Sequence, residues 1–241
     1  RSRHFVADLG FYQKNAESIF ERFYGKLTDF VILALLPSYL EQGGSSLVAM
    51  VQYFVERSGQ EVEGFYLHNH RQLLQNIALA KKSGKKVLLI GVTYALLDLA
   101  EECQQVDFSD VTIMETGGMK GRRREMIREE LHEQLQHAFQ VKAIHSEYGM
   151  TELLSQAYSF GKGIFHLPPQ MQILLRDLND PFDVSNKHRS GGINVIDLAN
   201  VDSCAFIETK DIGKLHPDGT FEVLGRFDNS DIRGCNLLVA T

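Results

Sequence analysis

The chain has 241 residues, of which 44% are hydrophobic and 23% are charged, as in a soluble globular protein with one large or two small domains. Its formal net charge of -6 argues against nucleic acid as the main partner. We expect no membrane span, because the apolar run after residue 29 is far too short, and residues 1–10 show no signal-peptide pattern. Three cysteines without a C-x-x-C pair predict neither a disulfide framework nor a zinc site, so the expected location is the cytoplasm.

Helical and strand patterns alternate through the first two thirds of the chain. Amphipathic spacing predicts helices over residues 8–25, 45–59, 68–84, 95–105 and 121–139. Wholly apolar or β-branched runs predict buried strands over residues 29–37, 85–92 and 110–118, and residues 141–152 read as a strand leading into a loop. This alternation predicts an α/β fold whose parallel sheet is flanked by helices.

Shorter strands follow after about residue 160. They are expected over residues 171–178, 191–199, 204–213 and 221–227, and "HPDGTF" (216–221) reads as a hairpin turn. The sequence therefore predicts an α/β subdomain over residues 1–160 and a small antiparallel β subdomain over residues 161–241.

The segment "HSEYGMTE" (145–152) follows a predicted strand with an aromatic ring, a turn at Gly149, a hydroxyl and a carboxylate. Ligands of open α/β sheets bind at the carboxyl ends of strands, where this loop should lie. Tyr148 could stack on a purine, and Glu152 could bind Mg²⁺ together with substrate phosphates. The alternative is a helix start, with Thr151 as the N-cap and Glu152 in the first turn.

Two further segments offer ligand-binding chemistry. In "ETKDIGKLHPDGTFEVLGRFD" (208–228), Asp211 could accept both hydroxyls of a ribose and Arg226 could reach the ribose or a phosphate, unless this is an ordinary surface hairpin. In "METGGMKGRRRE" (114–125), the two glycines allow close approach of a flat ligand. The Arg122–Arg124 triplet there faces either a nucleotide or an acidic partner, or it is a solvated helix start.

In this order and at these separations, the three segments resemble the acyl-adenylate-forming superfamily. The resemblance implies ATP and Mg²⁺ as cofactors. It places Tyr148 against adenine, Thr151 at the phosphate or the acyl carboxylate, and Glu152 on Mg²⁺. It also assigns the ribose hydroxyls to Asp211 and the ribose–phosphate region to Arg226. The remaining cofactor-binding residues that it implies are Gly117 and Gly118 in the adenine slot, and Gly149.

The chain departs from the superfamily pattern in several places. "LALLPSYLEQGG" (33–44) resembles the wall of the acyl pocket without its usual histidine, and the depth of that pocket depends on Phe11, Tyr12, Leu36 and Tyr39. The usual T-G-D reads Thr209-Lys210-Asp211. The phosphate loop that should precede residue 1 is missing, so we expect these residues alone to be incomplete for adenylate formation. Only residues 229–241 follow Asp228, where most members continue into a further domain.

One branch of the superfamily fits these features. "METGGMKGRRREMIREELH", "HSEYGMTELLSQAYS" and "GRFDNSDIRGCNLLV" resemble the acyl-protein synthetase family of bacterial bioluminescence over essentially the whole chain. The resemblance implies a ligase that activates a fatty acid as acyl-AMP and accepts the acyl group on a cysteine near the C-terminus. That position is Cys235, and an acyl-accepting reductase or carrier protein would be the partner.

The chemistry of Cys235 agrees with this role, because a thiolate attacks a mixed anhydride readily. An unperturbed thiol is only a few per cent thiolate at neutral pH, so the nearby cations Arg226 and Arg233 would help to activate it. The alternative is a small buried cysteine in a last strand, as we expect for Cys103 in a helix and Cys204 in a strand. Two other functions stay open: a truncated acyl- or aryl-CoA ligase, and a non-catalytic nucleotide-binding or carrier-docking module.

Overall fold

The computed structural model describes residues 4–36, 44–67, 69–102, 106–117, 126–184 and 189–227. Its helices are α1 (Leu9–Tyr24), α2 (Ser46–Ser58), α3 (His70–Lys82), α4 (Thr93–Glu102) and α5 (Arg128–Phe139), with 3-10 turns η1 (Leu27–Asp29) and η2 (Leu198–Asn200). Its strands are β1 (Phe30–Leu35), β2 (Lys86–Val92), β3 (Val111–Thr116), β4 (His145–Tyr148), β5 (Ala157–Ser159), β6 (Ile164–His166), β7 (Met171–Arg176), β8 (Ser190–Asp197), β9 (Phe206–Leu215) and β10 (Phe221–Arg226). All of these strands belong to one sheet in the order β1-β2-β3-β4-β5-β6-β10-β9-β8-β7.

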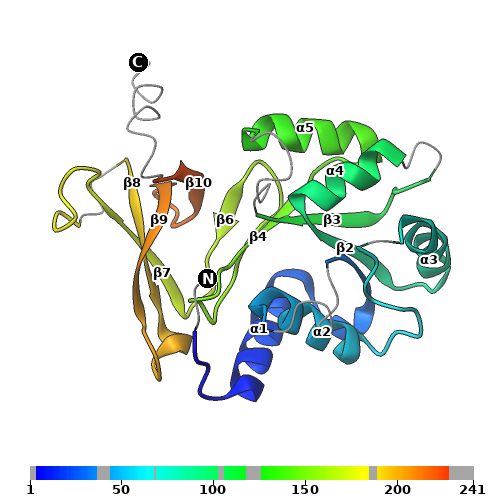
Figure 1. The fold of residues 1–241 in the computed structure, drawn as a ribbon, viewed down its shortest axis with the longest axis horizontal. Helices are drawn as coiled ribbons and strands as arrows, with labels where there is room; N and C mark the ends of the chain where they lie inside the picture. The colour runs from blue at the N-terminus through cyan, green and yellow to red at the C-terminus, as the bar shows by residue number, and fades with distance from the viewer. Residues whose placement is uncertain are drawn as a thin grey trace.

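The first four strands are parallel and make up the α/β half of the molecule. Every residue of β1 is buried, as expected for a parallel strand covered on both faces. Figure 1 shows α4 and α5 on one side of these strands and α1 and α2 on the other. Asp8 caps α1 by accepting from the Phe11 amide, and Gly59 ends α2 in the left-handed conformation.

From β4 onward, the neighbouring strands run antiparallel. In Figure 1, β7 to β10 lie away from the helices. The turn after His216 is the predicted hairpin: the His216 amide donates to Thr220 O at 2.8 Å, and Gly219 has φ +85°. The α/β class with a following antiparallel part is thus confirmed, whereas the division at residue 160 stays a prediction, with β5 and β6 on either side of it in the same sheet.

Helix α5 and strands β5 and β6 differ from expectation. Helix α5 begins at Arg128, whereas the pattern placed its start at residue 121; Met126 and Ile127 precede the helix. Ile127 has extended backbone angles, and Glu129 and Glu130 then occupy the first turn, where carboxylates complement the helix dipole. The short strands β5 and β6 were not predicted, because three residues carry no readable periodicity.

Two hydrophobic clusters fill the molecule. The larger lies between the parallel strands and the helices, and the smaller lies against the antiparallel strands around Phe165, Ile173, Ile193 and Phe221. Tyr148 at the end of β4 belongs to the smaller cluster, so the last parallel strand contributes to the antiparallel half. Within the described ranges, no helix is both long and apolar enough to cross a lipid bilayer.

Candidate nucleotide site

Tyr148, Asp211 and Arg226 meet where the parallel and antiparallel parts of the sheet join. The Tyr148 hydroxyl donates to Asp211 Oδ2 at 2.9 Å, and Arg226 Nε lies 3.2 Å from Asp211 Oδ1. The Tyr148 ring packs edge-on against Phe165 and Phe221 at centroid distances of 5.9 and 5.4 Å. The structure therefore brings together three residues that the sequence analysis selected from two separate segments.

Two β-bulges surround this contact. Residues 209–211 of β9 lie opposite the single residue Ile193 of β8, and Leu224 is the extra residue where β10 pairs with β9. Past that second bulge, Arg226 is the register partner of Asp211. Bulges re-aim side chains and are common beside active sites. The Asp211 side chain is only 10% exposed, whereas that of Arg226 is 69% exposed, so the carboxylate is buried and the guanidinium faces solvent.

Burial and the adjacent Asp211 carboxylate raise the pKa of Tyr148 well above its ordinary range. The hydroxyl therefore keeps its proton and acts as a donor to Asp211. Tyr148 is itself only 8% exposed, so a purine could meet little of its ring in this conformation. Stacking of Tyr148 on adenine stays a prediction.

Thr151 and Glu152 lie in a turn between β4 and β5, in which the Leu153 amide donates to Met150 O at 3.1 Å. No helix begins here, so the alternative of Thr151 as an N-cap is wrong. Both residues are partly buried, and neither side chain makes a hydrogen bond or ion pair with another described residue. The turn is anchored from the antiparallel half, because Asn200 Nδ2 donates to Glu152 O at 2.7 Å.

The chain that follows this turn is held by Asp197, a fully buried carboxylate at the end of β8. Its Oδ2 accepts from the amides of Leu154 and Ser155 at 2.8 and 3.0 Å. Its Oδ1 accepts from the Ser155 hydroxyl at 2.7 Å and from the Ala199 amide at 3.2 Å. Asp197 thus fixes the path of the chain immediately after Glu152.

A buried polar cluster lies at the carboxyl ends of the parallel strands. Glu115 is 3% exposed and Glu147 is 8% exposed. The Thr93 hydroxyl donates to Glu115 Oε2 at 3.3 Å, and His132 Nε2 lies 3.6 Å from Glu115 Oε1 and 3.5 Å from the Ser146 hydroxyl. The sequence analysis did not select these residues, although a glutamate near the end of the apolar strand "VTIMET" was a usable signal.

The two glutamates of this cluster have opposite pKa shifts. Burial raises the pKa of Glu147 to about 7, and the neighbouring Glu115 carboxylate adds to the effect. Burial alone would also raise the pKa of Glu115, but hydrogen bonding to His132 and the nearby Arg128 outweigh it, so this pKa lies below its ordinary value. Arg128 and His132 of α5 thus keep Glu115 ionised. The negative charge of Glu115 then repels the Glu147 carboxylate and raises its pKa.

The predicted glycines have different surroundings. Gly117 is exposed after β3, and a Cβ added there would have nothing within 4 Å, so a flat ligand has room to approach. A Cβ on Gly149 would collide with the Glu147 carboxylate. This contact explains a glycine at position 149 without any bound cofactor. Gly118 and the Arg122–Arg124 triplet lie outside the described residues.

The residues named for the acyl pocket and for thiol chemistry are only partly described. Tyr12 and Leu36 are buried and Phe11 is 48% exposed, whereas Tyr39 lies outside the described residues. Cys103 and Cys235 lie outside them as well. Cys204 is exposed two residues before β9, where its thiol donates to Phe206 O at 3.2 Å, so its expected place in a strand is wrong.

Several solved structures resemble this chain. ATP-bound MatB from Rhodopseudomonas palustris matches 90% of it with a TM-score of 0.65 and 15% identity. O-succinylbenzoate coenzyme A synthetase (MenE) from Bacillus subtilis, in complex with AMP, matches 92% with a TM-score of 0.60 and 22% identity. The amide bond synthetase McbA from Marinactinospora thermotolerans matches 90% with a TM-score of 0.62 and 14% identity.

The chain shares the fold of these synthetases. This confirms the fold expected from the resemblance to adenylate-forming enzymes, and identities this low show the fold alone. The chain spans 44–46% of the length of these three proteins. No protein-family model matches the sequence, and no curated protein matches it.

Proposed function

We propose that this chain belongs to an acyl-protein synthetase, which activates a fatty acid with ATP as acyl-AMP and transfers the acyl group to Cys235. The contact between Tyr148, Asp211 and Arg226 carries the proposal, because it joins segments 63 residues apart into one candidate nucleotide site. The shared fold with proteins solved with bound ATP or AMP supports it.

In the proposed first step, an oxygen of the fatty-acid carboxylate attacks the α-phosphorus of ATP. The new P–O bond forms as the bond to pyrophosphate breaks, and no general base is needed because the attacking carboxylate is already ionised. Asp211 would accept the ribose hydroxyls, and the exposed end of Arg226 would reach the ribose–phosphate region. The Thr151 hydroxyl would contact the phosphate or the acyl carboxylate. Positioning would supply most of the rate enhancement.

Mg²⁺ fits the residues present at this site. Magnesium binds one or two carboxylates together with substrate phosphates, and the Glu152 carboxylate has no ion-pair partner among the described residues. Glu152 would therefore hold the ion. When bound, the ion would offset charge on the triphosphate.

In the proposed second step, the Cys235 thiolate attacks the acyl carbonyl carbon of acyl-AMP. A C–S bond forms, the C–O bond to the phosphate breaks, and AMP leaves with the electron pair. The resulting thioester stays reactive enough to pass the acyl group to a reductase or carrier protein.

The experiment that tests the proposal supplies a preformed long-chain acyl-AMP and measures intact mass. The wild type should gain one acyl adduct that excess AMP suppresses and that only Cys235→Ser abolishes. Cys204→Ser is the matched control, because Cys204 is an exposed thiol outside the candidate site, and Cys103→Ser completes the set. Slow labelling of all three cysteines, insensitive to AMP, would contradict transfer to Cys235.

The Mg²⁺ role of Glu152 is tested by the affinity for ATP with and without MgCl₂. Wild type should bind ATP more tightly with magnesium, and Glu152→Gln should lose that difference. Glu129→Gln, a change of the same kind at an exposed position in α5, should keep it. An unchanged magnesium effect in Glu152→Gln removes this residue from the metal site.

A second candidate is an acyl- or aryl-CoA ligase, which the fold shared with the coenzyme A synthetase MenE favours. Here free coenzyme A would take the acyl group from acyl-AMP, and Cys235 would stay unlabelled. Binding of AMP without acyl transfer to either thiol would instead indicate a nucleotide-binding or carrier-docking module.

A further inference from the structure

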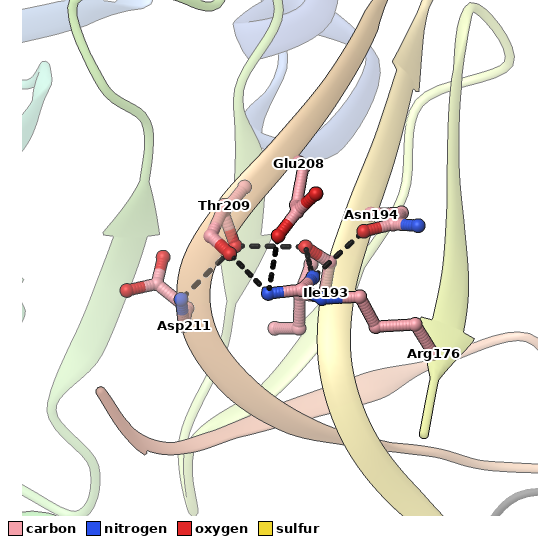
Figure 2. A network of polar contacts seen from close by, with 6 residues as sticks. All are labelled: Arg176, Ile193, Asn194, Glu208, Thr209 and Asp211. Atoms are coloured by element: carbon pink, nitrogen blue, oxygen red, sulfur yellow. Dashed lines mark hydrogen bonds and ion pairs between the residues drawn. The ribbon is translucent and has the colours of Figure 1, made fainter. Parts of the chain in front are cut away.

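Arg176, at the end of β7, is a buried arginine in the antiparallel half of the sheet, with 5% of its surface exposed. A buried charge is costly unless it is paired and hydrogen-bonded. Figure 2 shows that its guanidinium points into the sheet, where Nη1 donates to Ile193 O at 3.0 Å and to Asn194 Oδ1 at 2.7 Å. Nη2 donates to Thr209 O at 2.7 Å and lies 3.4 Å from Glu208 Oε1. Arg176 therefore links β7, β8 and β9.

These contacts fall on the bulge formed by residues 209–211. A bulge interrupts the ladder of main-chain hydrogen bonds, and Arg176 donates to main-chain oxygens on both sides of the interruption, those of Ile193 and Thr209. The Thr209 hydroxyl also donates to Ile193 O at 2.9 Å and accepts from the Asp211 amide at 3.0 Å. The guanidinium is thus connected to the main chain of Asp211 through one residue, Thr209.

Arg176 also contacts the residue that directly follows β10, the strand that carries Arg226. Its guanidinium carbon lies over the ring of Phe227, 5.4 Å from the centroid. The Phe227 amide donates to Lys210 O at 2.7 Å, which ties the end of β10 to the same bulge. Arg176 therefore touches a residue two positions before Asp211 and the residue directly after Arg226.

The space for this guanidinium depends on Gly192, the register partner of Arg176 in β8. A Cβ added at Gly192 would lie 2.5 Å from Arg176 Cζ. Changing Gly192 to alanine would therefore displace the guanidinium without changing its charge. This offers a second perturbation of the same contacts.

We propose that Arg176 is a positioning residue that, through the bulge at residues 209–211 and through Phe227, orients Asp211 and Arg226 to bind the ribose of an adenine nucleotide. Arg176 itself touches no substrate. The inference rests on the proposed function, because ribose binding by Asp211 belongs to it.

The test compares the affinity of the whole chain for AMP with its affinity for 2′,3′-dideoxy-AMP, which lacks both ribose hydroxyls. Wild type should prefer AMP by about tenfold or more, since a hydrogen bond to a charged group contributes that much. Arg176→Met should lose most of this preference, with the affinity for dideoxy-AMP changed less than about twofold. Arg176→Lys should behave like Arg176→Met, because an ammonium cannot reproduce the planar fork of donors.

Gly192→Ala provides the independent arm, since it keeps the arginine and should also reduce the preference for AMP. Arg57→Met controls for loss of a positive charge, because Arg57 pairs with Glu17 at the surface of the helical layer and should leave the preference unchanged. Melting temperatures and circular dichroism are recorded for each variant. If Arg176→Met does not fold, the two nucleotide affinities are compared in Gly192→Ala and in Glu208→Ala, which removes the exposed ion-pair partner of Arg176.

The outcomes separate the inference from the proposed function. Loss of the preference for AMP in the Arg176 and Gly192 variants supports positioning. In an Asp211→Ala background no carboxylate remains to be oriented, so the Arg176 and Gly192 changes should have no further effect on the preference for AMP. A preserved preference, or parallel weakening of both nucleotides, overturns the inference and leaves nucleotide binding intact. A wild type that fails to bind AMP, or binds both nucleotides equally, overturns the ribose role of Asp211 and the inference together.

Discussion

The hydrogen bond from Tyr148 to Asp211 can be removed without changing the packing around it. Tyr148→Phe deletes only the hydroxyl and keeps the ring against Phe165 and Phe221. The change leaves Asp211 Oδ2 without its donor at 2.9 Å, and Arg226 remains on Oδ1. Stability and nucleotide affinity should both respond.

The expected magnitude follows from the burial of the carboxylate. A hydrogen bond to a charged group contributes about 1.5–3 kcal/mol to stability. Removing the donor also leaves a buried acceptor unpaired, and the protein then bears the full desolvation cost of that acceptor. Since the Asp211 side chain is 10% exposed, water reaches it poorly. We expect Tyr148→Phe to lower the free energy of unfolding by about 2 kcal/mol, a fall in Tm of roughly 4–8 °C for a domain of this size.

Tyr158 is the matched control in the same assay, thermal and urea unfolding followed by circular dichroism. It is 1% exposed, and its hydroxyl has no hydrogen-bond partner in the described part of the chain. Tyr158→Phe should therefore be neutral or stabilising. The reasoning is refuted if both variants lose the same stability, or if Tyr148→Phe unfolds within about 0.5 kcal/mol of wild type, the usual range for surface substitutions.

Three further predictions concern Glu147, Gly149 and Asp197, which lie beside the site. Because burial raises the pKa of Glu147 from 4.5 to about 7, its protonated form is favoured on folding. Wild type should therefore lose up to about 3 kcal/mol relative to Glu147→Gln as pH rises from 4.5 to 7, and a difference in urea unfolding that is independent of pH would contradict this. Gly149→Ala should cost about 1 kcal/mol, because the buried Glu147 carboxylate must shift away from the added methyl group, whereas Gly117→Ala should unfold like wild type; equal stability of the two variants would mean that Glu147 moves aside freely. Asp197→Asn should cost about 3 kcal/mol, because an amide cannot accept on both sides as the carboxylate does. Asp218→Asn, in the exposed hairpin turn, should cost clearly less, and similar values for the two would show that Asp197 does not anchor the turn.

The parallel half was predictable because its signals are local. A six-residue apolar run such as Phe30–Leu35 and helix caps such as Asp8 and Gly59 identify the element in which they lie. Tyr148, Asp211 and Arg226 could be selected from their chemistry and from the family resemblance. Their mutual contact could not, since it depends on two bulges and on the pairing of β10 with β9.

Arg176 shows why the rest of the site was not predictable. The sequence "MQILLRDL" does not distinguish an arginine that ends a strand in solvent from one that turns into the sheet. The difference is set by Gly192 and by the carbonyl groups of Ile193 and Thr209, which lie 16 to 33 residues further along the chain. Asn200 and Glu152 pose the same problem, because their contact crosses 48 residues.

The order of the strands has a consequence for synthesis on the ribosome. Strand β6 ends at residue 166, but its second neighbour is β10, which begins at Phe221. During elongation, one edge of the growing sheet at β6 therefore stays open until residues 221–226 have left the exit tunnel. Open strand edges pair with other chains. Slower translation between β6 and β10 should therefore raise the yield of aggregated protein, and faster passage or chaperone cover should lower it.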